Sequence, residues 1–461
     1  MKNKLLITLL LLVSFLQAQE KKESYSFSLQ QAIDHALQYN YSIINANRDI
    51  EAAKQKKWET TATGLPQISG SLGYLNNIDF TLQGVSGNAF NPAGNPDAIS
   101  LFAFGTKQSM NSNLTLSQLL FDGSYIVALQ ASKTYLKYYE NAKQKTNLEI
   151  REMVINAYGN VLLAEESVAI LEKNKATLSK TLSDTQETFN NGLIEEENVE
   201  QLQITLSSIN SNLSNVKRLL VIANKMLKFS LGIEVSSELK LTDKLDALTA
   251  SNLDLSLTQN SFEVSQNINY QMASNFQEQR SLELKLQKSK ALPSLGAAFN
   301  FGYNSFANEF DFANGDQKWN RFSNLGVSLN VPLFTSLGRS AKTQQAKIAL
   351  DQAKTQLTQT EQQLKLEYER MKSDYDFSIE EYATSKSNLS LAERIEKKQE
   401  IKFREGLSSS FDFSEAQRQL YTSQQNYLQS MVNIINKKAA LEKIVNKRES
   451  CQKISSIYQE V

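Results

Sequence analysis

The chain has 461 residues, and its 49 lysines and arginines balance its 49 aspartates and glutamates. A net charge of zero gives no reason to expect a nucleic-acid partner. One cysteine, Cys451, and one histidine, His35, cannot build a disulfide, a Cys/His zinc site or a Cys–His catalytic pair. We therefore predict no cofactor, no metal and no enzymatic activity of these kinds, while catalysis by carboxylates alone stays open.

The first 18 residues have the features of a secretory signal peptide. Lys2 and Lys4 precede an apolar run, residues 5–16, that is too short to span a membrane as a helix, and Ala18 offers a small residue for cleavage. After residue 20 we expect no apolar run of membrane-helix length. The exported chain is then either soluble or enters a membrane as a β-barrel.

Residues 65–122 alternate between apolar and small or polar side chains, which is the period of a β-strand. Ile68, Leu72 and Tyr74 follow this rule in a first run, and Leu114 and Leu116 follow it in a second. The sequence between them, QGVSGNAFNPAGNPDAIS, is rich in Gly, Asn and Pro and predicts an irregular loop. Together they predict a hairpin.

Proline placement predicts two long helical stretches. The five prolines leave residues 97–292 and everything after Pro332 without one, and glycine is rare in the same stretches. Proline breaks helices, so its absence permits them to be long. Residues 124–189 alone would extend on the order of 100 Å as one helix, which suits a chain that must bridge a distance.

A second pair of alternating runs lies between the helical stretches. Its apolar residues include Phe299, Phe301 and Tyr303 in one run, and Leu325 and Val327 in the other. Each run is close to the length of a transmembrane strand, about 9–11 residues. A soluble sandwich would show the same alternation. The signal peptide, the aromatic side chains on the apolar face and the lack of further strands favour a membrane barrel. Four strands cannot close one, so we expect the chain to oligomerise.

The second helical stretch carries a seam of alternating four- and three-residue spacings, as in a coiled coil. Its members are Ala346, Leu350, Ala353, Leu357, Thr360, Leu364, Glu367 and Met371. The polar tail after it contains Cys451, to which we assign no role.

Two segments repeat one short motif. FNNGLIEEENVEQLQ begins at Phe189 and FREGLSSSFDFSEAQ begins at Phe403, so Phe-x-x-Gly-Leu recurs at an offset of 403 − 189 = 214 residues. A motif used twice at this distance indicates a duplicated architecture.

These features together resemble the TolC-like outer membrane efflux protein family, the outer membrane factors of tripartite export systems. FSLQQAIDHALQYNYSI resembles its opening helix, and LPQISGSLGY and LPSLGAAFNFGY resemble its two entry strands. LTLSQLLFDGS and VSLNVPLFTSLGRSA resemble its returning strands, and the two Phe-x-x-Gly-Leu segments resemble its helix turns. The resemblance implies a mixed α/β membrane protein: a homotrimer whose three chains give four strands each to one 12-stranded outer-membrane β-barrel, continued by a long antiparallel α-helical coiled-coil tunnel through the periplasm.

The resemblance also implies a division of the chain. The expected parts are a signal peptide (1–18), an N-terminal periplasmic helix (19–64), a first barrel hairpin (65–122), a first long helical pair (123–231), an equatorial linker (232–258), a second-repeat opening helix (259–291), a second barrel hairpin (292–334), a second long helical pair (335–447) and a C-terminal tail (448–461). The implied function is passive export of drugs, small molecules or secreted proteins. The implied partners are outer-membrane lipid, a periplasmic membrane-fusion adaptor and an inner-membrane pump of the RND or ABC class, which covers multidrug efflux and type I secretion.

By the same resemblance, Asp412 and Glu415 match the acidic residues that ring the periplasmic aperture of the tunnel. They lie three residues apart, so they share one helical face, and three copies would surround a constriction with six carboxylates that attract cations. The plainer alternative is that Asp412 supports the start of a helix and Glu415 is solvated.

The turn residues Gly192, Leu193, Gly406 and Leu407 match the positions that engage adaptor hairpins, and the alternative is packing within the turn. Glycine suits the left-handed position that ends a helix, and Ser408 or Ser409 could cap the returning helix. The family can hold its gate with a basic and an acidic residue; here those positions are Ser408 and Asn198. Because both lack charge, we expect packing or hydrogen bonds to hold the gate.

An exported coiled-coil spacer without channel activity is the main alternative function. It predicts extraction without detergent.

Overall fold

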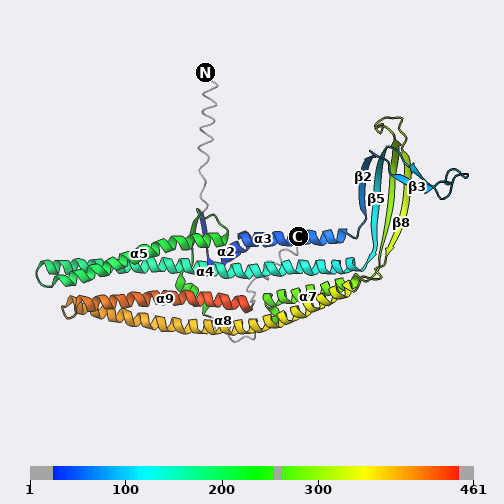
Figure 1. The fold of residues 1–461 in the computed structure, drawn as a ribbon. Helices are drawn as coiled ribbons and strands as arrows, with labels where there is room; N and C mark the ends of the chain where they lie inside the picture. The colour runs from blue at the N-terminus through cyan, green and yellow to red at the C-terminus, as the bar shows by residue number, and fades with distance from the viewer. Residues whose placement is uncertain (1–23, 254–261, 446–461) are drawn as a thin grey trace, which may run out of the picture. The chain divides into compact units, whose positions relative to one another are not determined.

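The computed structural model describes residues 24–253 and 262–445 (Figure 1). The predicted signal peptide and the predicted tail with Cys451 lie outside the described residues. The chain divides into two compact units. The first is built from three separate segments and the second from two. Of the described residues, the first unit comprises 24–50, 139–253, 262–274 and 355–445, and the second comprises 51–138 and 275–354.

The second unit contains an antiparallel four-stranded sheet in the order β2-β5-β7-β8. The strands are β2 (Gln67–Asn76), β5 (Gln108–Asp122), β7 (Ser294–Ala307) and β8 (Asn320–Asn330). They confirm the predicted strand pairs, one from each half of the sequence, and add that β5 pairs with β7. Strands β2 and β8 are the open edges, and an open edge exposes unpaired backbone groups.

The two faces of this sheet differ in chemistry along rows that cross all four strands. One row joins Ile68, Leu116, Phe299 and Leu325, whose exposed fractions are 71%, 39%, 42% and 73%. The next row joins Ser69, Thr115, Asn300 and Asn324. In that polar row Thr115 donates to Asn300 at 2.7 Å, and Asn300 donates to Asn324 at 2.9 Å. An apolar face this exposed suits lipid, and the hydrogen-bonded face suits water.

The segment predicted as an irregular loop after β2 contains a second, two-stranded antiparallel sheet. Its strands are β3 (Leu82–Ser86) and β4 (Ile99–Ala103). The loop prediction was wrong for the six residues of these strands that lie within it, 83–86 and 99–100, because the Gly, Asn and Pro residues that suggested it are concentrated in the turn between the strands, at residues 87–97.

The long helices come in two nearly equal sets. Helices α4 (Gly123–Asn190) and α5 (Glu196–Leu231) have 68 and 36 residues, and α8 (Gly338–Arg404) and α9 (Ser410–Val445) have 67 and 36. The starts of α5 and α9 are 410 − 196 = 214 residues apart, the same offset as the repeated motif. The duplication predicted from the motif is therefore present in the helices.

A buried asparagine marks the same position in each half. Asn40 separates α2 (Leu29–Tyr39) from α3 (Tyr41–Ala62); it donates to Ser230 O and accepts from Ser42 N–H. Asn267, just before α7 (Ile268–Ser289), donates to Ile444 O and accepts from Asn269 N–H. Each amide thus ties the end of one helix of its repeat to the start of another.

The part predicted as an N-terminal periplasmic helix, residues 19–64, contains three elements within its described residues. Strand β1 (Ser24–Phe27) precedes α2. The helix is interrupted between α2 and α3 because Asn40 adopts an extended backbone conformation. The predicted linker 232–258 forms strand β6 (Glu238–Leu241), which pairs with β1 in parallel, and helix α6 (Leu245–Asn252); its last five residues lie outside the described residues. The predicted opening helix 259–291 is present as a short 3₁₀ turn, η2 (Val264–Gln266), and α7.

The helical unit is held by a core that α2, α4, α5 and α9 share. Its fully buried side chains include Val154, Tyr158 and Val161 of α4, Leu227 of α5 and Val432 of α9. One stretch of α4 is long and apolar enough to cross a membrane by length and composition, contrary to the expectation that none follows the leader. Because 44% of that stretch is buried and α4 packs in this core, we assign it to the bundle.

Candidate functional site

The candidate site is the pair of turns that join α4 to α5 and α8 to α9. Both turns place glycine in the left-handed region, with φ of 75° at Gly192 and 71° at Gly406. In the first, Leu193 N–H donates to Thr188 O and Gly192 N–H donates to Phe189 O; in the second, Leu407 N–H donates to Lys402 O and Gly406 N–H donates to Phe403 O. These paired bonds are a Schellman motif, which satisfies the last carbonyls of a helix.

Each motif leaves a leucine in solvent. Leu193 is 75% exposed and Leu407 is 78% exposed. A leucine that packed within its own turn would be covered, so the alternative of packing within the turn does not describe these side chains.

A serine–aspartate pair caps the start of α9. Ser409 Oγ accepts from Asp412 N–H at 3.1 Å, and Asp412 Oδ2 accepts from Ser409 Oγ at 2.8 Å and from Ser409 N–H at 3.4 Å. This reciprocal arrangement is a capping box, in which an acidic residue takes the third helical position. The hydrogen bonds from Ser409 lower the pKa of the exposed Asp412 carboxyl. Of the two candidates for the cap, Ser409 fills the role.

Glu415 forms an ion pair with Arg418, a partner that was not predicted from the sequence. Arg418 donates from Nε at 2.9 Å and from Nη2 at 2.6 Å to Glu415 Oε2. The ion pair is exposed, with 73% of the Arg418 side chain and 49% of the Glu415 side chain accessible. Glu415 is therefore solvated and locally neutralised. The sequence did carry a signal for this ion pair, because side chains three residues apart on a helix are neighbours and Arg418 follows Glu415 at that spacing.

The two turns are connected by a hydrogen bond between the repeats. Asn198, in the first turn of α5, donates to Glu195 O and accepts at 3.3 Å from the backbone N–H of Ser410. Ser408 donates instead to Gln399 of α8 at 3.1 Å. The two uncharged positions predicted to replace a charged lock thus both form hydrogen bonds within the chain, though not with each other.

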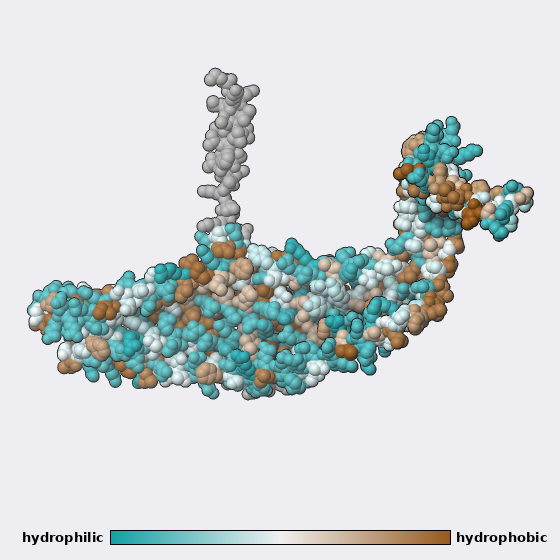
Figure 2. Space-filling model, viewed as in Figure 1, coloured by the Kyte–Doolittle hydropathy of each residue, from teal (hydrophilic) through white to brown (hydrophobic). Residues whose placement is uncertain are grey.

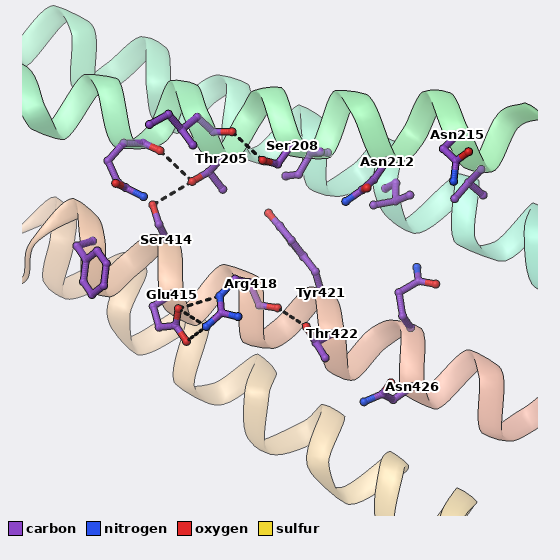
Figure 3. Close-up of a pocket in the computed structure, with 17 residues that line it drawn as sticks. Thr205, Ser208, Asn212, Asn215, Ser414, Glu415, Arg418, Tyr421, Thr422 and Asn426 are labelled. Carbon is purple, nitrogen blue, oxygen red and sulfur yellow. Dashed lines mark hydrogen bonds and ion pairs between the residues drawn. The ribbon is translucent and has the colours of Figure 1, made fainter.

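Behind the turns, α5 and α9 enclose a groove of about 760 Å³ (Figure 3). Polar side chains face it from both helices, and Tyr421 points into it from α9. Thr205 of α5 donates to Ser414 of α9 at 3.3 Å across its end nearest the turns. The groove also includes Glu415 and Arg418, so the ion pair lies on its wall.

A partly buried acid lies inside the second helix pair. Burial raises the pKa of Glu396, the charge of Glu400 raises it further, and a hydrogen bond from Gln417 opposes both. Burial and the charge of Glu396 raise the pKa of Tyr421. Gln417 is 1% exposed, and its side-chain oxygen lacks a hydrogen-bond partner. The α8–α9 pair thus holds a partly buried polar cluster, Glu396, Gln417 and Tyr421, close to its turn.

His35 lies away from these turns, against the rings of Tyr39 and Phe27 at 4.6 and 5.0 Å. Burial lowers its pKa. Within residues 24–253 and 262–445, no group of three or more Asp, Glu, His or Cys residues is arranged to hold a metal ion.

Comparison with known proteins gives this geometry a context. The sequence matches the outer membrane efflux protein family over residues 32–233 and 265–447. It is 24% identical to outer membrane protein TolC of Vibrio cholerae serotype O1 over 246 residues, 52% of this chain and 54% of that relative. The matched region therefore spans about half the length of the curated relative.

Solved structures share the fold over nearly the whole chain. The CmeC outer membrane channel of Campylobacter jejuni is 17% identical, with a TM-score of 0.70 and coverage of 95% of this chain and 93% of that one. VceC of Vibrio cholerae is 17% identical, with a TM-score of 0.68 and coverage of 90% and 95%. CusC is 16% identical, with a TM-score of 0.72 and coverage of 93% and 95%.

Proposed function

The chain belongs to the outer membrane efflux protein family, whose members are outer-membrane channels, and from this premise we propose that it is the outer-membrane channel of a tripartite export system. It conducts substrates passively from an inner-membrane pump and a periplasmic adaptor to the outside. The energy comes from the pump, and the channel performs no chemistry and needs no cofactor.

The single observation that carries the proposal is the arrangement of rows on the four-stranded sheet. The row from Ile68 to Leu325 is apolar and exposed, whereas the neighbouring row from Ser69 to Asn324 is polar and hydrogen-bonded. One face suits lipid and the other suits an aqueous pore. A coiled-coil spacer, the alternative function, has no use for four strands with such faces.

The open edges β2 and β8 support a trimer. Four strands cannot close a barrel, and a membrane leaves no water to satisfy unpaired edge groups. Pairing β2 of one chain with β8 of the next removes both open edges of the four-stranded sheet. Three chains give 12 strands, and the helices of each chain line the tunnel that continues the barrel.

The tips of the helix pairs are the proposed contact with the adaptor. Leu193 and Leu407 are exposed beside glycines that hold identical turns. An exposed leucine on a rigid turn suits the groove of a partner's helical hairpin. Both classes of pump, RND and ABC, can be served by this geometry, because the contact is made with the adaptor.

Asp412 and Glu415 are the proposed aperture residues. The ion pair between Glu415 and Arg418 modifies the expected charge. Per trimer, three each of Asp412, Glu415 and Arg418 give −3 − 3 + 3 = −3, so the ring is less acidic than the six carboxylates alone would make it. The aperture then attracts cations more weakly than the sequence analysis expected.

Hydrogen bonds are the proposed means of holding the gate. The bond between Asn198 and Ser410 N–H joins the two turns of one chain, at positions where a charged lock is absent.

The proposal is tested by crosslinking in intact cells, purification from the outer-membrane fraction, and identification of co-purified proteins by mass spectrometry. We expect a detergent-dependent trimer together with a periplasmic adaptor and an inner-membrane pump. The class of the pump identifies whether the channel serves efflux or secretion. Recovery of a monomer from the soluble fraction, without partners, would discard the channel and leave the coiled-coil spacer.

A further inference from the structure

The hairpin of β3 and β4 exposes apolar side chains on both of its faces. On one face Leu82, Ile99 and Leu101 are 56%, 77% and 63% exposed. On the other, the rings of Phe102 and Phe104 lie 4.9 and 6.2 Å from that of Phe90. Figure 2 shows hydrophobic surface along this hairpin and polar surface at its tip.

Such a hairpin does not suit water. A two-stranded sheet alone is marginally stable at best, and among the residues that the structure describes no helix or second sheet packs as a layer on this one. Residues 77–106 contain two acidic residues, Asp79 and Asp97, and no lysine or arginine. An apolar surface this continuous marks a site that another surface covers.

Membrane lipid does not suit the apolar surface of the β3–β4 hairpin. The hairpin has two strands and therefore two open edges, and open sheet edges do not occur in the hydrocarbon of a membrane. It also lacks the cationic side chains that hold lipid phosphates. A protein surface with its own polar groups can satisfy the edges and cover the faces together.

The topology indicates which protein surface lies nearest. Strand β2 ends at Asn76 and β3 begins at Leu82, so the hairpin follows directly from one open edge of the barrel sheet. The other open edge, β8, begins at Asn320, directly after the loop of residues 308–319. Both points lie at the same end of the sheet, because β2 pairs through Asn76 with Gln108, Gln108 pairs with Ala307, and Asn304 pairs with Asn320.

When β2 of one chain pairs with β8 of the next, the hairpin therefore emerges beside the β7–β8 loop of that second chain. This loop and its flanks also expose aromatic side chains: Phe306, Phe310 and Trp319 are 54%, 63% and 37% exposed. The two apolar surfaces are brought together by the same seam that closes the barrel.

We propose that the β3–β4 hairpin of each chain packs on the β7–β8 loop, residues 306–319, of a second copy of this chain and latches neighbouring subunits at the outer rim of the barrel. The inference rests on the proposed function, since it needs the β2–β8 seam of the trimer. It adds an interface outside that seam.

The test places a photoreactive benzoylphenylalanine at Leu101 in the full-length protein in its own outer membrane. Irradiation is expected to give covalent dimers and trimers, with crosslinked peptides that map to residues 306–319 of the second copy. The matched control carries the same residue at Leu114, which is 50% exposed on the apolar face of the central strand β5 and is expected to give no chain-to-chain product.

A second variant tests the contact itself. In the Leu101 crosslinking background, Phe310→Ser is expected to lower the yield severalfold, whereas Glu309→Gln leaves it unchanged. An intact trimer in which Leu101 reacts only with lipid, with another protein or with nothing overturns the latch and leaves the channel standing. A chain that forms no trimer in the membrane overturns the proposed function itself, and native mass spectrometry of the same sample distinguishes the two.

Discussion

The two tips of the helix pairs share a backbone and differ in almost every charged side chain. Gly192 and Gly406 have the same left-handed φ, and both turns close with the same pair of hydrogen bonds. At the common offset of 214, however, Asp412, Glu415 and Arg418 of the second tip correspond to the neutral residues Asn198, Gln201 and Ile204 of the first.

The reverse exchange occurs at the start of the second helix of each pair. Glu195, Glu196 and Glu197 of the first tip correspond to Ser409, Ser410 and Phe411 of the second. Glu195 makes no side-chain cap hydrogen bond, whereas Ser409 caps α9. Glycine fixes the turn in both copies, and the side chains around it are free to take different roles. The proposed function places the aperture at the second tip alone, and the following variants test that proposal.

The largest expected effect is on adaptor binding. Leu407→Glu places a charge where a leucine is expected to enter the adaptor, and lost apolar burial of about 3 kcal/mol corresponds to an affinity loss on the order of 100-fold. Because Leu407 is exposed, the trimer should retain its thermal stability. Adaptor affinity is measured with purified trimers, and Leu193→Glu is the matched variant at the first tip. A folded Leu407→Glu trimer that binds the adaptor normally contradicts the contact.

Removal of Arg418 is expected to increase the difference in charge between the two tips. Arg418→Gln leaves Glu415 unpaired, and the aperture charge of the trimer changes from −3 to −6. Block of the isolated channel by a trivalent cation should strengthen about tenfold, since opposite charges at close range in partly screened surroundings interact by a few kcal/mol at most. Single-channel recording in planar bilayers measures this. Arg404→Gln, which removes a cation that pairs with Glu400 and not with a proposed aperture carboxylate, is the control, and equal effects of both would mean that the pair has no special place at the aperture.

Substitution of the residue that precedes α9 is expected to destabilise its helix more than substitution of the residue that precedes α5. Ser409→Ala removes the side-chain half of the capping box, leaves the backbone N–H of residue 409 to donate to Asp412, and is expected to cost about 1 kcal/mol, whereas Glu195→Ala removes no cap hydrogen bond and should cost a few tenths. Amide hydrogen exchange in the first turns of α9 and α5 reports each change locally. Faster exchange of equal size in both turns would show that the two starts are held alike.

The hydrogen bond between the tips is expected to contribute to the closed gate. Asn198→Ala removes the acceptor for Ser410 N–H, a loss of about 0.5–1.5 kcal/mol that should raise the open probability of the isolated channel severalfold. Ser408→Ala is the comparison, because Ser408 bonds to Gln399 within its own helix pair. If neither variant changes the conductance trace, hydrogen bonding does not hold the gate.

The smallest expected effect concerns pH. Burial raises the pKa of Glu396, whereas the matching residue of the first tip, at 396 − 214 = 182, is Leu182, which packs against a hydrophobic core. A carboxyl whose pKa is higher in the folded state stabilises the fold at low pH, and that contribution is lost as pH rises from the ordinary value of about 4.5 through the raised one. Glu396→Gln should therefore be more stable than the wild type at pH 7 and equal to it at pH 4. Thermal unfolding at the two pH values measures the difference, and a variant that is less stable at pH 7 contradicts the assignment.

Much of this molecule is dictated locally and can be predicted from one sequence. Strand alternation identified all four strands of the main sheet, because a period of two must place every second side chain on one face. Missing prolines and the repeated Phe-x-x-Gly-Leu identified the four long helices and their turns, because only glycine adopts the left-handed turn without strain. Asp412 and Glu415 could be placed on one helical face from their spacing.

Contacts between distant segments could not be predicted in this way. The break at Asn40 depends on a carbonyl 190 residues away, and the β3–β4 hairpin was hidden by the turn residues at its tip. Asn198 meets Ser410 across 212 residues. Periodicity and turn chemistry follow from covalent geometry and are readable along the chain, whereas the partner of a side chain depends on which helices the fold brings together.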